Sequence, residues 1–246
     1  AYFKLNDIEK SESLLKSALK INSKNPEIYI VFGLIYEYLG DIDKAIESYI
    51  VSIKLDNKNP ISFNNLGACY AFNGQTDLAI LNFKKSTFLD GSFYDAVYRL
   101  GQMQIYNFEF IEGWHNFKKR WLSSDYNHKK LKTSKPLMDD LNTKDLNILA
   151  WNEQGLGDQI MYGSMFNELS KRVNKLIIRI DKRLINIFRL KHPQIQFFGT
   201  EDIIDEKTYD KHVPFGHLGS HFRLNKIDFQ NSMSPYITCN KKTKSF

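Results

Sequence analysis

The sequence has few cysteines, few prolines and no long apolar run. Its 246 residues include two cysteines, Cys69 and Cys239, and neither has a second cysteine or a histidine at metal-ligand spacing. We therefore expect neither a disulfide framework nor a metal site. No stretch reaches the roughly 18 to 20 uncharged apolar residues that a membrane helix needs. These absences favour a soluble, cytoplasmic protein.

The sequence also has no excess of negative charge, since its net charge is +6. Residues 1–121 sum to about zero, so the positive excess belongs to the second half. Basic residues are densest between 171 and 191, where they form either a solvated helix face or an attractive surface for a phosphorylated ligand or an anionic membrane. A peripheral association with the inner membrane is one expectation. Stacking aromatics do not interleave with these charges, which disfavours nucleic acid.

Residues 1–121 repeat with a spacing of 34. Glycine recurs at Gly33, Gly67 and Gly101, and a large side chain recurs at Tyr49, Phe83 and Phe117. Small residues suit the crossing points of two helices, and large ones fill the space between them. Asn25-Pro26 and Asn59-Pro60 are typical of helix starts. Gly40-Asp41 and Gly74-Gln75 are typical of turns.

This period resembles the tetratricopeptide signature. The resemblance implies an α-solenoid of about three and a half copies over residues 1–121. We expect the chain to be truncated at its N-terminus, because the first copy starts in the middle of its first helix. The fourth copy has Phe108 where a turn glycine is expected. Polar and basic residues around Pro136 predict a linker or a loosely packed cover at 122–143.

Residues 144–246 alternate apolar runs with helical patterns, which favours parallel βαβ units and a Rossmann-like α/β domain. Strands are predicted at 146–151, 176–180, 195–198 and 213–214. Helices are predicted after the first strand and at 182–190, with Met161 and Met165 in the core.

A glycine-punctuated acidic loop, Glu153-Gln154-Gly155-Leu156-Gly157-Asp158, follows the first of these strands. Gly155 and Gly157 would let the backbone turn sharply and approach an anion. The loop lacks the third glycine of a dinucleotide fingerprint and the lysine of a P-loop, so both nucleotide motifs are disfavoured. Asp158 is either the N-cap of the following helix or a general base.

Together with Gly113-Trp114-His115 and with Tyr209 to Pro214, this loop resembles bacterial tetratricopeptide proteins whose C-terminal half is a GT-B glycosyltransferase-like domain. That domain is similar to glycosyltransferase family 9, the heptosyltransferases. The resemblance implies that residues 144–246 are the N-terminal half of a GT-B fold, incomplete at the C-terminus. It also implies a nucleotide-sugar donor as substrate, a saccharide or protein acceptor and no cofactor. The implied catalytic base is Asp158, and the implied substrate-binding residues are Glu153, Gln154, Gly155, Gly157, His212 and His217.

The concave face of the repeats is expected to bind a protein partner. Its predicted residues are Ile30, Leu34, Glu37, Asn64, Ala68 and Ala71. The leading hypothesis is a glycosyltransferase whose complete form transfers a sugar, with repeats for protein–protein interaction. This fragment alone is not expected to turn over sugar. The alternative is a noncatalytic tetratricopeptide scaffold or adaptor with a degenerate α/β domain.

Overall fold

A computed structural model describes residues 5–230, with side chains from residue 13 onward. The chain divides into two compact units, Ala1–Tyr126 and Asn127–Phe246. Cys239 lies outside the described residues, as does the end of the predicted 144–246 domain.

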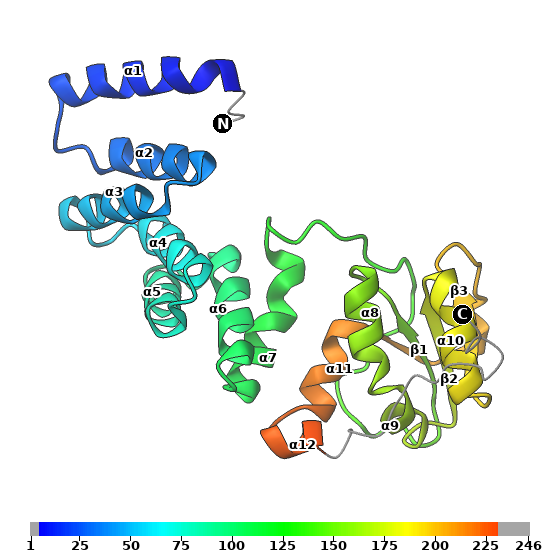
Figure 1. Cartoon of the computed structure of the whole chain (residues 1–246). Coiled ribbons are helices and arrows are strands. Elements are labelled where there is room, and N and C mark those ends of the chain that lie inside the picture. Colours follow the sequence, from blue (N-terminus) through cyan, green and yellow to red (C-terminus); the bar gives the residue numbers. More distant parts are fainter. Residues whose placement is uncertain (1–4, 231–246) are drawn as a thin grey trace, which may run out of the picture. The chain divides into compact units, whose positions relative to one another are not determined.

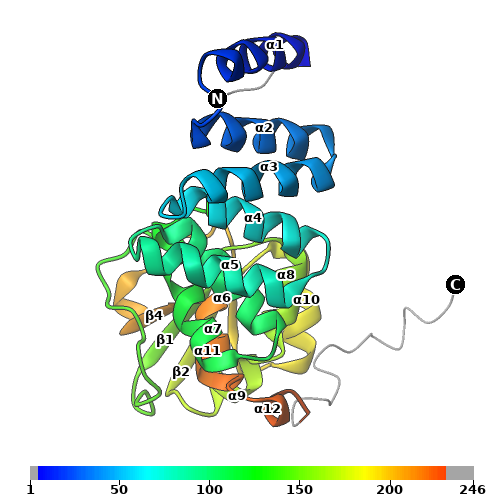
Figure 2. The ribbon, with the colours of Figure 1, turned by 90° about the vertical axis from the view of Figure 1, so that its left-hand side faces the viewer.

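The first unit is built from antiparallel helices that stack in chain order (Figures 1 and 2). Three helix pairs follow a single helix, α1, among the described residues. The bounds are α1 Leu5–Ile21, α2 Pro26–Leu39, α3 Ile42–Leu55, α4 Pro60–Phe72, α5 Thr76–Leu89, α6 Tyr94–Tyr106, α7 Phe110–Phe117 and the 3-10 helix η1 Lys118–Leu122. The predicted helical array is confirmed in these residues.

The repeat signals act locally, as the sequence predicts. Asn25 and Asn59 are the N-caps of α2 and α4, and each side chain accepts a hydrogen bond from a first-turn backbone N–H. Such a cap stabilises a helix by about 1 kcal/mol. Proline follows each cap at the first helical position, where its missing N–H costs nothing.

The glycine column allows the two helices of each pair to approach closely. A Cβ atom added at Gly33 would lie 2.4 Å from the Tyr49 ring, and one at Gly67 would lie 2.9 Å from the Phe83 ring. The large residues of the repeat therefore pack directly onto the glycines of the partner helix. This contact explains why both columns recur with the same period.

The second unit contains a four-stranded parallel sheet in the order β3-β2-β1-β4. Its strands are β1 Asn147–Trp151, β2 Lys175–Ile180, β3 Gln196–Gly199 and β4 Lys211–Pro214. Its helices are α8 Leu156–Gly163, α9 Phe166–Ser170, α10 Lys182–Lys191, η2 Glu206–Thr208, α11 Phe215–Phe222 and α12 Lys226–Gln230. The helix predicted after β1 is broken, because α8 ends at Gly163 and α9 begins at Phe166. Met165 is buried as predicted, but Met161 is exposed rather than in the core.

The two faces of the sheet have different covers. Because strand side chains alternate, Ile148 and Ala150 face the main core, to which α8 to α11 contribute apolar side chains. Leu149 faces the other side and belongs to a smaller cluster with Ile177 and Tyr209.

Segments without regular helix cover this second face. Leu131 packs against the smaller cluster. Thr133 Oγ1 hydrogen-bonds to Tyr209 Oη at 2.8 Å. Beyond it the chain runs along β4, where Met138 N donates to the His212 carbonyl at 2.8 Å, and the Met138 side chain enters the main core. Residues 122–143 are therefore not a free linker. The residues up to Tyr126 belong to the first unit, and those from Asn127 belong to the second.

Candidate functional site

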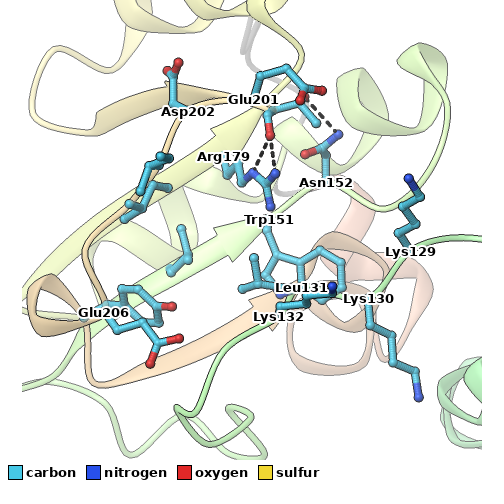
Figure 3. Close-up of a pocket in the computed structure, with 15 residues that line it drawn as sticks. Lys129, Lys130, Leu131, Lys132, Trp151, Asn152, Arg179, Glu201, Asp202 and Glu206 are labelled. Atoms are coloured by element: carbon cyan, nitrogen blue, oxygen red, sulfur yellow. Dashed lines mark hydrogen bonds between the residues drawn. The ribbon is translucent and has the colours of Figure 1, made fainter.

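A cavity of the second unit lies at the carboxyl ends of β1 and β2, on the face of the sheet opposite the α-helices (Figure 3). Its volume is about 920 Å³. In parallel sheets, ligands bind outside the carboxyl ends of the strands. The cavity is lined by Lys129, Lys130, Leu131, Lys132, Leu149, Trp151, Asn152, Arg179, Thr200, Glu201, Asp202, Ile203, Ile204, Glu206 and Tyr209.

Hydrogen bonds fix the wall that the strands form. Trp151 Nε1 donates to His212 Nδ1 at 3.1 Å, and burial lowers the pKa of His212. Arg179 Nε donates to the Thr200 carbonyl at 2.8 Å, and Nη2 donates to the same oxygen. Asn152 Nδ2 donates weakly to Thr200 Oγ1 at 3.5 Å. The bonds to Thr200 tie the ends of β1 and β2 to the loop after β3 (Figure 3), and the Trp151–His212 bond joins β1 to β4.

Charges of both signs line the cavity, but two of the acids already accept strong hydrogen bonds. Asp202 Oδ2 accepts from Gly199 N at 2.6 Å. Glu206 accepts from the hydroxyl of Ser134 at 2.5 Å and from its backbone N–H, which lowers the pKa of Glu206. The lysines of 129–132 come from the segment that crosses the sheet. The lining thus holds four basic and three acidic side chains.

The predicted loop after β1 does not line this cavity. Glu153 is buried, and its Oε1 accepts a hydrogen bond from Gly216 N at 2.6 Å, at the start of α11. The Gln154 carbonyl accepts from Gln159 Nε2 at 3.0 Å. Gln159 Oε1 in turn accepts from Asp181 N at 2.9 Å. These contacts hold the loop against the starts of α10 and α11.

Two structural expectations for this loop are wrong. Gly155, and not Asp158, is the N-cap residue of α8, so Asp158 lies in the first turn, where the helix dipole favours its carboxylate. Neither Gly155 nor Gly157 has a positive φ, so the loop makes no turn that only glycine allows. A Cβ added at Gly157 would meet nothing within 4 Å.

The two predicted histidines do not lie in the cavity lining. His212 is in β4, where it pairs with Leu149 and accepts the hydrogen bond of Trp151. His217 is buried in α11, and its carbonyl accepts from Ser220 Oγ at 2.7 Å. The loop lies beside His217, because Glu153 binds Gly216 N and α8 contacts α11, whereas neither the loop nor a histidine lines the cavity.

The predicted partner-binding residues of the repeats divide into exposed and buried ones. Leu34 is exposed. Glu37 Oε1 accepts from Tyr49 Oη at 2.6 Å and from Cys69 Sγ at 3.4 Å.

Ile30 and Asn64 are buried, so their side chains lie inside the helix stack rather than on its surface. Ala68 and Ala71 pack against the cluster around Phe83. The predicted binding face is therefore not wholly exposed, and fewer of its residues can contact a partner.

Sequence reasoning missed the lysines at 129–132 and the roles of Arg179 and Thr200. Composition alone assigns residues 129–132 to a linker. A signal was present in β2, because a charged Arg179 interrupts an apolar strand, and such a residue needs a polar partner near the strand end. The partner, the Thr200 carbonyl, is 21 residues away and becomes adjacent only when β3 pairs with β2.

The described helices of the first unit define a protein of the α-helical tandem-repeat class. The sequence model described as TPR repeat matches residues 33–74. The chain therefore contains tetratricopeptide repeats. Of the described helices, none combines the length and apolar character of a membrane span.

Solved structures similar to the chain include tetratricopeptide proteins. The MamA protein is 24% identical with a TM-score of 0.42, over 46% of this chain and 62% of that one. YrrB, described as having an unusual peptide-binding site, is 17% identical with a TM-score of 0.44, over 50% and 63%. The TPR2B domain of yeast Sti1, solved as a complex with pHsp70, is 22% identical with a TM-score of 0.38, over 42% and 82%. The chain thus spans 62% of the length of MamA. No curated protein matches the chain.

Proposed function

We propose that this chain is a tetratricopeptide scaffold whose repeat unit binds a protein partner. The observation that carries the proposal is the tandem array of helix pairs, part of which matches the TPR repeat model. Each repeat buries its apolar face against a neighbour, and the array leaves an extended surface for a partner.

The first helices of the pairs present side chains that a partner can reach. Leu34 on α2 and Gln102 on α6 are exposed at equivalent repeat positions. The intervening α4 has the small Ala68 at this position, which leaves room for a side chain of the partner. The surface is therefore apolar at one end and polar at the other.

Site-specific photo-crosslinking tests this proposal. A photoreactive amino acid at Gln102 should crosslink a discrete protein in cells that express the chain, and the same group at Lys85 on α5 is the matched control. The captured protein, purified, should bind the full chain, and Leu34→Glu should weaken that binding by about tenfold or more. Equal crosslinking from both positions, or binding that ignores the Leu34 change, would refute a specific partner surface.

As a second candidate, we propose that the second unit binds a nucleotide sugar, as part of a GT-B glycosyltransferase-like domain. The strand order β3-β2-β1-β4 supports this, because the Rossmann-type doubly wound sheet has that order in its first four strands. The cavity at the carboxyl edge, with its lysines, supports an anionic ligand. Asp158 would act as general base on an acceptor hydroxyl, since it lies in the first turn of α8.

Ligand-observed NMR with a panel of nucleotide sugars tests the binding step. We expect one of them to bind the full chain, and Lys129→Glu with Lys132→Glu to abolish the signal. In the complete protein, Asp158→Asn should lower turnover by at least about tenfold with little change in stability. Unchanged turnover would refute the assignment of the base, and absence of any binding signal would refute the donor site.

A further inference from the structure

Three aromatic side chains project from the same repeat position on successive first helices. Tyr38, Phe72 and Tyr106 are spaced by 34 residues and lie at the C-terminal ends of α2, α4 and α6. Their side chains are 49%, 78% and 69% exposed. Exposed aromatics are costly to leave in water, and a regular series of them marks an interaction surface. We call these three residues the aromatic row.

At the last repeat, a further exposed aromatic, Phe108, lies in a strained backbone conformation close to the row in sequence. Gly40 and Gly74 occupy the turns that follow Tyr38 and Phe72, with φ of 77° and 71°. The equivalent turn residue after Tyr106 is Phe108, with φ of 64° and a side chain that is 60% exposed. A bulky residue in this conformation is a genuine outlier, and such strain concentrates at functional sites. Phe108 adds a fourth aromatic surface beside the row.

The turns beside the row are acidic. The second helices begin within a few residues of each aromatic, and their first turns carry acidic residues. Lys44 pairs with Asp41 at 2.5 Å, and Lys84 approaches Glu109 at 3.6 Å. In the part of the chain that the structure describes, no ion pair involves the remaining acids, Asp43, Asp77 and Glu112. This end of the repeats is thus aromatic and negatively charged.

A hollow of about 420 Å³ lies at the same end, between the second and third turns. It is lined by Gly74 to Leu78 and by Asn107, so Asp77 contributes a carboxylate to it. The hollow lies between the parts of the chain that carry Phe72 and Tyr106. A partner side chain that enters it can meet both an apolar surface and a negative charge.

The spacing of Phe72 and Tyr106 fits the repeat of a polyproline II backbone. Helices α4 and α6 contact each other, and helices in contact lie about 8–10 Å apart. A polyproline II segment rises about 3.1 Å per residue and returns to the same side every three residues, after roughly 9 Å. Aromatic-lined grooves bind such segments with little loss of conformational entropy. Basic residues on the adjacent edge of the segment would face the acids.

We propose that the aromatic row binds a proline-rich, basic segment of a partner protein in the polyproline II conformation. This inference rests on the proposed function of the repeats as a protein-binding unit, and it names the chemistry of the partner. Prolines at every third residue would stack on Tyr38, Phe72 and Tyr106 in turn. Arginines or lysines on the next edge would lie beside Asp43, Asp77 and Glu112.

Fluorescence anisotropy with the full chain tests the proposal. The probe is a labelled peptide of four Pro-Pro-Arg triplets, which places proline and arginine on separate edges of the helix. Two further peptides, of Pro-Pro-Glu and Gly-Ser-Arg triplets, control for charge and for backbone conformation. We expect saturable binding of the first peptide only, and a Kd that rises with salt because exposed charges contribute.

Variants separate the row from the rest of the surface. The triple variant Tyr38→Ser, Phe72→Ser, Tyr106→Ser should raise the Kd at least about tenfold, since buried aromatics dominate such interfaces. Phe88→Ser, which changes an exposed aromatic on α5 outside the row, should leave the Kd unchanged. Circular dichroism spectra that match those of the unchanged chain would show that each variant remains folded.

Several outcomes would overturn the inference. These are absence of saturable binding up to about 1 mM peptide, equal binding of the Pro-Pro-Glu peptide, and equal binding by the triple variant. A partner that crosslinks at Gln102 and still binds the triple variant would overturn the aromatic row while leaving the proposed scaffold function intact. Loss of both the crosslinked partner and the peptide signal in the unchanged chain would refute the two proposals together.

Discussion

Replacing Phe108 by glycine should stabilise the repeat unit, although it removes a large aromatic side chain. Phe108 has φ of 64° in a turn where the two preceding repeats use glycine. The left-handed conformation costs a residue with a Cβ about 1–2 kcal/mol. The ring of Phe108 contacts that of Phe110 edge-on, with centroids 6.0 Å apart. Phe108→Gly removes both the strain and this contact.

The two effects differ in size. The ring is mostly exposed, so we take its contact at the low end for aromatic pairs, about 0.5 kcal/mol. Relief of strain should exceed this, giving a net gain of roughly 0.5–1.5 kcal/mol for Phe108→Gly. Phe108→Ala loses the ring and keeps the strain, so it should cost about 0.5 kcal/mol. The glycine and alanine variants should therefore differ by about 1 kcal/mol or more.

Gly74→Ala provides the matched control. Gly74 has φ of 71°, and a Cβ added there would meet nothing within 4 Å, so the change introduces backbone strain alone. It should destabilise the unit by about 1–2 kcal/mol. Urea unfolding followed by far-UV circular dichroism measures all three variants, with unchanged m-values as the check that only stability has changed. Equal stability of Phe108→Gly and Phe108→Ala would refute the reasoning, because it would mean that φ carries no cost.

Three further changes test other contacts. Gly101→Ala should cost about 3 kcal/mol in unfolding free energy, because its Cβ would lie 2.6 Å from the backbone N of Phe117, and unchanged urea stability would contradict this. Glu153→Ala should cost about 2 kcal/mol by leaving Gly216 N unpaired, and Glu153→Gln, which keeps an acceptor, should cost less. Burial lowers the pKa of His212 below 6.5, so the unfolded state binds more protons and stability falls as the pH drops below 6.5. His212→Gln should flatten that dependence in pH-dependent unfolding, and an identical profile would exclude the role of His212.

Much of the architecture of the repeats follows from local signals. Asparagine–proline pairs start α2 and α4, and glycine turns end the first helices, because these signals act over a few residues. The 34-residue glycine column predicts close helix crossings, which the structure shows at Gly33 and Gly67. The strands of the second unit were predicted within one or two residues, since buried parallel strands read as short apolar runs.

The candidate functional sites could be predicted less well from the sequence, because they depend on contacts between segments that are distant along the chain. The family resemblance implies that Glu153 binds substrate. Pairing of β1 with β4 places its carboxylate where it accepts a hydrogen bond from Gly216 N, 63 residues away, which the sequence does not predict. Of the two predictions for Asp158, the N-cap is wrong, because the helix begins three residues earlier than that assignment requires. The general base stays a prediction. Residues 122–143 are predicted as a linker or a loosely packed cover, and from Asn127 onward they are a cover, because Leu131 packs on the second face of the sheet.

The sequence by itself determined the period of the repeats, the position of their turns and the order of strands and helices along the chain. Each of these depends on neighbouring residues and on side-chain periodicity. Only the tertiary structure decided which residues are exposed together. It buried Ile30 and Asn64 inside the helix stack and left Phe72 in solvent, because burial depends on what the neighbouring helices cover and not on hydrophobicity alone.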